Sequence, residues 1–271
     1  MCPMPVPPRR ANPWKAEMAL PETPSLRLDG KRAVITGAGR GIGKAMATAL
    51  AAAGAAVTLI ARTEAEIAAL DSELKGAGYL ADHAVLDVTN MSGVSAFFDE
   101  CDAFHILVNN AGTNRPKPMQ DVSEEDYDAV LDLNVKSAFF VAQACVKKML
   151  EQQQNGSLIH IGSQMGHVGG PNRSLYCASK WALEGMNKAF ALDLAKHGIR
   201  SNTIAPTFIE TELTRPFFED EAFMASVLEK IKLGRIGKPE DLMGAVLFLA
   251  SDASAMMTGS SMVIDGGWTA E

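Results

Sequence analysis

A tyrosine and a lysine four residues apart, Tyr176 and Lys180, could together exchange a proton with a substrate. On a helix, residues i and i+4 share one face, so both side chains can point into one cleft. A free tyrosine titrates near ~10, and a nearby ammonium group favours the phenolate, so we expect Lys180 to lower the pKa of Tyr176. Ser163, thirteen residues before Tyr176, could hydrogen-bond the same substrate oxygen. This is the chemistry of a carbonyl being reduced or an alcohol being oxidised.

Taken alone, this pair is weak evidence, because a tyrosine on a helix is more often a packed residue and a lysine one turn later a solvated charge. A glycine-rich turn near the start of the chain adds support, since it lies between a strand predicted over residues 32–36 and a helix predicted over residues 44–53. Glycines let the backbone approach a pyrophosphate, and the N-terminus of the helix offers unpaired N–H groups. The turn consists of Gly37, Ala38, Gly39, Arg40, Gly41, Ile42 and Gly43.

With both features in place, the chain resembles the short-chain dehydrogenase/reductase family, in its classical subgroup. The resemblance runs from Leu28 to Gly267, nearly the whole chain after its N-terminal extension. No single motif decides it, but their joint order and spacing do. The motifs are Thr36-Gly37-x-x-x-Gly41-x-Gly43, Asp87-Val88, Asn109-Asn110-Ala111-Gly112, Asn134, Ser163, Tyr176, Lys180 and Asn202-x-x-x-Pro206.

Composition agrees with a cytoplasmic enzyme that acts on a small molecule. The chain has 271 residues, 47% of them hydrophobic, which is enough for one sizeable α/β core. A net charge of −7 argues against nucleic acid or an anionic membrane as the main partner. We find no apolar run near the ~20 residues that a membrane span needs. The four cysteines show no C-x-x-C spacing, so reduced thiols and no metal site are expected.

The N-terminal residues 1–24 differ from the rest in being rich in proline, with seven in this stretch. Proline at this density excludes regular helix and favours an extended chain. The segment lacks the apolar stretch of a secretory signal, so export is not expected. We expect a flexible tail; the alternative is an arm laid across a neighbouring subunit, with Trp14 as its anchor.

Short apolar strands and longer helices alternate along residues 25–271, which predicts a single three-layer αβα domain. Such alternation is typical of a doubly wound, Rossmann-like parallel sheet covered on both faces. Ligands of these sheets bind beyond the carboxyl ends of the strands. A substrate lid is expected at about residues 207–232. Strands are predicted at 32–36, 56–61, within 79–86, at 106–109, 158–162, 200–205 and 261–264, and helices at 44–53, 64–75, 124–134, 136–152, 176–196 and 239–250.

The choice of cofactor depends on the end of the second strand. An acidic residue there would accept hydrogen bonds from the adenosine ribose and repel a 2′-phosphate. This chain has Ala61 at that position and Arg62 next to it, and Arg40 in the glycine turn could add a second cation. A guanidinium suits a phosphate, so NADP(H) is favoured and NAD(H) is possible. Glu64 could supply the missing carboxylate one turn later.

The remaining roles are implied by the resemblance. Lys180 is expected to bind the nicotinamide ribose, and Asn134 to hold a water that links Lys180 to solvent. One departure stands out: the family's Pro-Gly is here Pro206-Thr207, and because threonine adopts positive φ less freely than glycine, the entry to the lid could be stiffer. The other expected cofactor contacts are Asp87 and Val88 at the adenine, Asn110, Ala111 and Gly112 beside the adenosine, and Pro206, Ile209 and Thr211 near the carboxamide.

The substrate is the least determined part of the site. Met and Phe residues in the expected lid suit an apolar group, whereas the polar wall residues suit a hydroxylated or carboxylated one. The stretch Gly112-Thr113-Asn114-Arg115-x-x-Pro118 is similar to members acting on sugar acids such as gluconate and deoxygluconate. A 3-oxoacyl reductase acting on acyl-carrier-protein or CoA thioesters is the alternative. The candidate substrate residues are Asn114, Arg115, Gln164, His167 and Arg173.

A non-catalytic nucleotide-binding scaffold is the least favoured function, since such proteins lose part of the Ser, Tyr and Lys set that is complete here. The resemblance also implies a homotetramer or dimer, built through the helix that carries Tyr176, the long helix before it, and the last strand. The apolar helix predicted over residues 136–152 could bury against a partner, although packing in the core would explain the same pattern.

Overall fold

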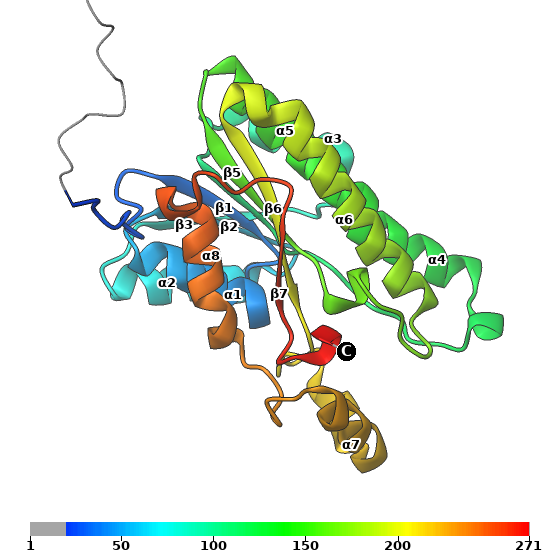
Figure 1. Ribbon diagram of the computed structural model, residues 1–271. Coiled ribbons are helices and arrows are strands. Elements are labelled where there is room, and N and C mark those ends of the chain that lie inside the picture. The colour runs from blue at the N-terminus through cyan, green and yellow to red at the C-terminus, as the bar shows by residue number, and fades with distance from the viewer. Residues whose placement is uncertain (1–19, 271) are drawn as a thin grey trace, which may run out of the picture.

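A parallel sheet of seven strands forms the centre of the computed structural model, which describes residues 20–270 (Figure 1). Its strand order is β3-β2-β1-β4-β5-β6-β7, and every neighbouring pair is parallel. The order reverses between β1 and β4, which is where a doubly wound sheet opens a crevice. The strands are β1 (Arg32–Thr36), β2 (Ala56–Ala61), β3 (Ala81–Val85), β4 (Ile106–Asn109), β5 (Gly156–Ile161), β6 (Ile199–Pro206) and β7 (Ser261–Ile264).

Helices cover both faces of this sheet. The helices α1 (Gly41–Ala52), α2 (Glu64–Gly76) and α8 (Met243–Ala250) lie on one face, and α3 (Met91–Glu100), α4 (Glu124–Leu131), α5 (Ser137–Glu151) and α6 (Ser174–Leu194) on the other (Figure 1). The helix α7 (Glu221–Lys230) stands apart beyond the sheet, near the C-terminus (Figure 1). The prediction of a doubly wound α/β fold is confirmed.

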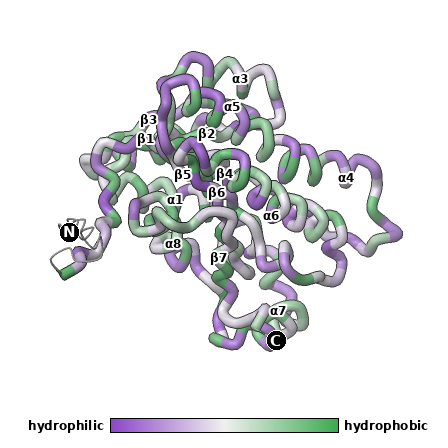
Figure 2. Tube along the Cα trace, turned by 45° about the horizontal axis from the view of Figure 1, so that its top comes forward, coloured by the Kyte–Doolittle hydropathy of each residue, from purple (hydrophilic) through white to green (hydrophobic). Residues whose placement is uncertain are grey.

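Alternate residues of a strand pack into two different hydrophobic cores, one on each face of the sheet. On β1, Ile35 packs with α1, α2 and α8, while its neighbour Val34 packs with α3 and α5. The same alternation separates Leu59 from Ile60 on β2. Because both faces are covered, β2 and β4 are mostly apolar and not alternately polar, whereas β3 and β6 also carry polar residues. Figure 2 shows both hydrophobic and hydrophilic segments among the labelled strands.

The predicted elements are placed well, with errors where local signals are weak. The strands β1, β2, β4 and β7 match the predicted residues. The helices α3 and α7 were not predicted, because their short apolar patterns are interrupted by polar residues. A five-residue π-helical turn, Asp132–Lys136, joins α4 to α5, so the two predicted helices are one continuous helical run.

That run, Glu124–Glu151, is long and apolar enough to cross a membrane by length and composition alone, since an 18-residue window of it has a mean hydropathy of 1.4. Charged residues such as Asp132 and Lys136 interrupt the run, so it is not the continuous apolar stretch that the sequence prediction excluded. Its apolar residues Val141, Cys145 and Met149 are buried in the core beneath the sheet. A core helix of this kind meets the same length and hydropathy criteria as a membrane span, so the run is weak evidence for one.

The proline-rich extension lies mostly outside the described residues. Residues 20–24 are exposed and have neither helix nor strand, whereas the proposed anchor Trp14 falls within residues 1–19, which are not described. Three of the cysteines, Cys101, Cys145 and Cys177, are free thiols, and Cys2 lies outside the described residues.

Candidate active site

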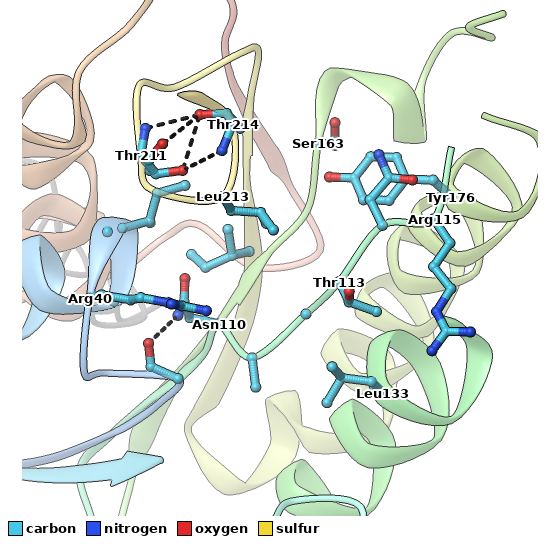
Figure 3. A pocket seen from close by; sticks show the side chains of 18 of the residues that line it. Arg40, Asn110, Thr113, Arg115, Leu133, Ser163, Tyr176, Thr211, Leu213 and Thr214 are labelled. Carbon is cyan, nitrogen blue, oxygen red and sulfur yellow. Dashed lines mark hydrogen bonds between the residues drawn. The ribbon is translucent and has the colours of Figure 1, made fainter. Parts of the chain in front are cut away.

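A cleft of about 1020 Å³ opens along the carboxyl ends of the strands, beside the crevice between β1 and β4. Its size is at the upper limit of small-molecule sites, which leaves room for a dinucleotide together with a substrate. Four turns that follow β1, β4, β5 and β6 supply the glycine loop, Asn110, Ser163 and Pro206. Residues far apart in the chain therefore meet because parallel strands end at the same edge, as Figure 3 shows for Arg40, Asn110, Ser163 and Tyr176.

The glycine turn after β1 is shaped for close approach of a ligand. Gly37 and Gly41 have φ angles of +62° and +53°, which other residues adopt only at a cost. A Cβ at Gly43 would clash with the Gly37 carbonyl oxygen. The helix α1 then begins with no side-chain cap and no acidic residue in its first turn. Its free N–H groups face the cleft, which fits the pyrophosphate of a dinucleotide.

Asn110 holds this turn against the sheet. Its side-chain Nδ2 donates to the carbonyl oxygens of Thr36 at 2.9 Å and Gly37 at 3.0 Å. The backbone N–H groups of Asn110 and Ala111 both donate to the Thr36 hydroxyl at 3.0 Å. These bonds tie the ends of β1 and β4 together, so the position of the glycine turn is set by the neighbouring strand.

Two exposed arginines stand at the end of the cleft nearest β2. Arg62 lies 4.0 Å from the Asp87 carboxylate, and its side chain is 71% exposed. Arg40 lies 3.8 Å from Glu66 and 3.4 Å from Glu212, and so connects the start of α2 to the lid segment. Exposed pairs of this kind contribute little to stability and can exchange partners.

The acidic residue at this end is not the one expected. Glu66 lines the cleft beside Gly39, whereas Glu64 does not line it. Glu66 lies two residues after Glu64 on α2, and the helix turns between them, so the two side chains point in different directions and that of Glu66 lies against the glycine loop. Of the two acids, Glu66 and not Glu64 is therefore placed to meet a ligand in the cleft.

Ser163, Tyr176 and Lys180 meet at the other end of the cleft. The Tyr176 hydroxyl points toward Ser163 in Figure 3. Lys180 is buried, its Nζ donates to the Ile161 carbonyl oxygen at 2.7 Å, and it lies 5.5 Å from the centre of the Tyr176 ring. Burial lowers the pKa of Lys180 from its usual 10.5 to about 8, and the Glu184 carboxylate acts in the opposite direction.

The pKa of Tyr176 departs from the expected direction. Burial of the Tyr176 hydroxyl away from water raises its pKa above the usual value of 10, while the Ser163 hydroxyl and the Arg173 cation act to lower that pKa. The expectation that Lys180 would lower this pKa is not met in this structure, because its ammonium group is desolvated and hydrogen-bonded to the backbone behind the ring.

Asn134 lies behind the catalytic wall, in the π-helical turn between α4 and α5. Its amide Nδ2 donates to the Thr113 carbonyl oxygen at 2.9 Å and to the Ser179 hydroxyl at 3.0 Å, and its Oδ1 accepts from the Thr113 N–H at 2.8 Å. The extra residue of the turn is what brings this side chain between β4 and α6. Asn134 therefore connects the segment after β4 to the helix that carries Tyr176 and Lys180.

The segment after β6 forms the opposite wall. Thr211 and Thr214 bond to one another and to the nearby backbone, and Thr211 packs against Gly41 (Figure 3). Thr207 does not have positive φ, so threonine in place of the family glycine introduces no backbone strain here. The expected stiffening of the lid entry therefore has no basis in the backbone angle.

The five substrate candidates divide into those that line the cleft and one that does not. Asn114, Arg115, Gln164 and Arg173 line the cleft. His167 does not line it: its Nε2 lies 2.9 Å from the Ser261 hydroxyl at the start of β7 and 3.5 Å from Glu184 on α6, which corrects its assignment. Gln164 is engaged by the Ser163 hydroxyl, which donates to its Oε1 at 2.8 Å.

Comparison with known proteins agrees with this geometry. A family model described as Enoyl-(Acyl carrier protein) reductase matches residues 37–269, most of the chain. The 2-dehydro-3-deoxy-D-gluconate 5-dehydrogenase of Escherichia coli is 38% identical over 247 residues, covering 90% of this chain and 97% of that protein. The chain belongs to the short-chain dehydrogenase/reductase family.

Two further members of this family bear on the site. The 3-oxoacyl-[acyl-carrier-protein] reductase of Thermotoga maritima is 39% identical over 246 residues, covering 89% of this chain and 99% of that protein. The crystal structure of a gluconate 5-dehydrogenase from Burkholderia cenocepacia, in complex with NADP and tartrate, is 39% identical with a TM-score of 0.88, covering 91% of this chain and 98% of that one. As a member of the short-chain dehydrogenase/reductase family, this protein is an oxidoreductase.

Sequence reasoning missed several residues of this short-chain dehydrogenase/reductase site. Glu66, Glu212 and Phe217 line the cleft but stand in no motif. Glu66 could have been found, because it lies in the first turn of the helix predicted over residues 64–75, close to the end of the second strand. For Glu212 and Phe217 the sequence held no such signal, because their segment folds back over the cleft only through long-range contacts.

In residues 20–270, the group of side chains with metal-ligand spacing is Asp71, Asp82 and His83, away from the cleft.

Proposed function

We propose that this protein is an NADP(H)-dependent oxidoreductase that moves a hydride between the cofactor and a carbonyl or secondary alcohol of a sugar acid or polyol. The observation that carries the proposal is the meeting, in one cleft, of the uncapped N-terminus of α1 with Ser163, Tyr176 and Lys180. One end of the cleft fits a dinucleotide and the other end offers a proton donor beside a hydroxyl.

Each side chain has a defined task in this mechanism. The bound nicotinamide would supply or accept the hydride. Tyr176 gives its proton to the substrate oxygen in reduction and removes it in oxidation. Ser163 donates a hydrogen bond to the same oxygen as charge develops on it. Lys180, whose Nζ lies 5.5 Å from the centre of the Tyr176 ring, would bind the nicotinamide ribose and exchange protons beside that ring.

Proton supply is assigned to the residues behind the cleft. Asn134 would hold the water that links Lys180 to solvent, since it connects the Thr113 backbone to Ser179 beside Lys180. A pKa of about 8 lets Lys180 pass a proton near neutral pH. The protein thus positions and exchanges protons, while the cofactor carries out the redox step.

The preference for NADP(H) is supported by the charges at the β2 end. Ala61 replaces an acid there, and Arg62 and Arg40 are exposed with their guanidinium groups at the cleft. A 2′-phosphate would replace Asp87 and Glu66 as their partner at small cost. The Burkholderia cenocepacia relative was crystallised with NADP. Asp87 and Val88 would lie at the adenine, and Ile209 and Thr211 at the carboxamide.

A sugar acid or polyol is supported by the polar wall and by the relatives. Asn114, Gln164 and Arg173 offer amide and guanidinium groups to a hydroxylated substrate. The E. coli relative is a 2-dehydro-3-deoxy-D-gluconate 5-dehydrogenase, and the crystallised one a gluconate 5-dehydrogenase.

A 3-oxoacyl thioester is the second candidate substrate. The observation that favours it is the aromatic lining of the lid, where Phe208 packs against Phe223 with ring centres 5.6 Å apart. Such a surface suits an acyl chain, and the Thermotoga maritima relative is a reductase of this type.

We also propose that the enzyme is a cytoplasmic homotetramer or dimer. Exposed apolar residues on α5 and α6, namely Phe140, Trp181 and Leu192, would be covered by a partner together with the Asp265-Gly266-Gly267 segment. Sedimentation of the purified protein tests this directly, and a monomer at micromolar concentration would contradict it.

The first experiment is a calorimetric titration with NADPH and NADH, followed by an activity panel. Binding of NADPH at least ~10-fold tighter than NADH is expected from the two arginines. The panel compares D-gluconate and other aldonates, D-sorbitol and a 3-oxoacyl thioester, in the direction each allows. Turnover of the thioester alone would replace the sugar substrate with the second candidate. Failure to bind either nucleotide would remove the proposal.

A further inference from the structure

Arg173 is a buried arginine without a charged partner at the wall of the cleft. It is 6% exposed, and its Nη1 has no hydrogen-bond partner. The groups that act on its charge are Tyr176 and Cys177, and in residues 20–270 no carboxylate pairs with it. A buried charge is costly unless it is paired, so a guanidinium held in this way implies a partner that arrives with a ligand.

The aromatic surroundings of Arg173 leave its hydrogen-bond donors unused. Its guanidinium lies 5.2 Å from the centre of the Phe217 ring and 5.9 Å from that of Phe208, both on the lid side of the cleft. Aromatic faces hold a cation without consuming its hydrogen-bond donors. They also exclude water, which makes an ionic contact with an incoming anion stronger than at an exposed site.

A second buried donor without a partner lies across the cleft, in the segment after β6. The hydroxyl Oγ1 of Thr207 is buried and has no hydrogen-bond partner, and Thr207 lines the same cleft. In the described part of the chain four buried side-chain atoms lack a hydrogen-bond partner, and two of them belong to Arg173 and Thr207, which both line this cleft. Both could satisfy the oxygens of one anionic group.

The backbone before Arg173 fixes its direction. Asn172 has a φ of +58°, one of two non-glycine residues with positive φ among those described. Its carbonyl oxygen accepts from the Lys117 N–H at 3.1 Å, which anchors the turn to the segment after β4. The helix α6 starts at the next residue, Ser174, so Arg173 is its N-cap and stands three positions before Tyr176.

Arg115, the other arginine of the substrate wall, is already engaged. It lies 3.2 Å from the buried Asp126 and 3.3 Å from Glu125, and Lys117 also pairs with Asp126 at 2.5 Å. An arginine whose charge is balanced in this way gains less from a further anion. Of the two guanidinium groups, Arg173 is the one available to a substrate.

We propose that Arg173 binds the carboxylate of the substrate, with the Thr207 hydroxyl as its second contact, and so selects hydroxy acids and oxo acids over neutral polyols and ketoses. This rests on the proposed hydride transfer and specifies its substrate class. A planar guanidinium matches a carboxylate in bidentate fashion, and its place one turn before Tyr176 puts the acid group at a fixed offset from the reacting carbon.

The test compares Arg173→Met with Arg115→Met on a matched substrate pair. D-gluconate and D-sorbitol have the same six-carbon chain and differ at C1, which is a carboxylate in one and an alcohol in the other. For Arg173→Met we expect kcat/KM for D-gluconate to fall by about 30- to 1000-fold, and that for D-sorbitol to change less than about 3-fold. Arg115→Met should lower both by less than about 5-fold.

Further measurements separate a binding role from a structural one. The NADPH dissociation constant of Arg173→Met should stay within about 3-fold of the wild type, since the arginine lies outside the cofactor end. Arg173→Lys should retain part of the selectivity, because its charge remains but not its bidentate geometry. Added guanidinium should partly restore D-gluconate oxidation by Arg173→Ala. Equal losses on both substrates, or no restoration, would overturn the proposal.

Failure of this proposal is distinguishable from failure of the proposed function. A wild-type enzyme that oxidises D-sorbitol as well as D-gluconate would overturn the role of Arg173 and leave NADP(H)-dependent hydride transfer intact. Turnover of the 3-oxoacyl thioester alone would overturn the role of Arg173 and the sugar-acid substrate, and would leave hydride transfer intact. A wild-type enzyme that binds neither nucleotide would overturn both.

Discussion

The two ends of the cleft hold their positive charges in opposite ways. At the β2 end, Arg62 and Arg40 are exposed and already paired with carboxylates. At the α6 end, Arg173 and Lys180 are buried, and neither forms an ion pair with a carboxylate of the described chain. The exposed ion pairs at the β2 end change the free energy of folding little. The buried, unpaired cations at the α6 end lower the stability of the folded chain.

This difference teaches what each end is built to do. Exposed arginines can leave one acidic partner for a phosphate at nearly equal free energy, so they select between two cofactors by modest factors. Buried cations cannot be satisfied by water, so a ligand or transition state that reaches them gains a large stabilisation. Substitutions at the α6 end should therefore change activity more than those at the β2 end.

The largest effect is expected from Tyr176→Phe. Loss of the hydroxyl removes the proton donor, so kcat should fall by about 10³-fold while the NADPH dissociation constant changes little. Stopped-flow measurement of a single turnover, beside a fluorescence titration with NADPH, checks both quantities. Turnover within a few-fold of the wild type would show that another group transfers the proton.

Lys180→Met tests whether a buried charge is kept at the expense of stability. We expect kcat to fall by about 10²-fold or more, while the free energy of unfolding at pH 7 rises by up to about 3 kcal/mol, because the pKa of Lys180 is depressed to about 8. Chemical denaturation of both proteins measures the second quantity. A variant less stable than the wild type at pH 7 would contradict this account.

The pH dependence of that comparison follows from the sign of the shift. Between about pH 8 and 10.5 the unfolded chain binds more protons at Lys180 than the folded one, so this group makes the wild type more stable as pH rises. The advantage of Lys180→Met should be complete below pH 8 and shrink as the pH approaches 10.5. A difference between the two proteins that is constant over this range would rule out burial of the charge as its cause.

At the β2 end, Arg62→Gln should weaken NADPH binding by about 10- to 50-fold and NADH binding by less than about 3-fold. The arginine is exposed and would contact the 2′-phosphate, which NADH lacks. Calorimetry at two salt concentrations measures both affinities and should show a smaller salt dependence in the variant. Equal weakening of the two nucleotides would place Arg62 elsewhere in the cofactor site.

The smallest effect is expected from Glu66→Gln, since this carboxylate competes with the phosphate for Arg40. Its removal should tighten NADPH binding by about 2- to 5-fold, and Glu64→Gln, outside the cleft, is the matched control. If NADH, which lacks the 2′-phosphate, also bound more tightly by the same factor, the effect of Glu66 would not depend on competition with that phosphate.

Much of the fold could be predicted because parallel strands leave a strong local signal. Short runs such as residues 32–36 and 56–61 have consecutive apolar residues, since both faces are covered, and the glycines between strand and helix mark the turn. The helices α3 and α7 were missed, because their apolar residues become recognisable only against the surfaces they cover.

The catalytic set was named from the sequence by its motif order, and the structure places its members around one cleft, with Asn134 behind the wall. The substrate wall was named less well. His167 stood beside Ser163 in the chain but turned toward Glu184, because the 3₁₀ turn Gln164–Gly166 reverses the chain before it. Sequence proximity does not fix the direction of a side chain after a turn.

The sequence by itself determined the chemistry: a tyrosine, a lysine and a serine at fixed spacing, a glycine turn before a helix, and arginine in place of an acid after the second strand. Those signals are local, since each depends on residue types a few positions apart. Tertiary structure decided which charges are buried and which are paired. Whether Arg115 or Arg173 is available to a substrate depends on Asp126 and the lid phenylalanines, and these meet the two arginines only after the chain has folded.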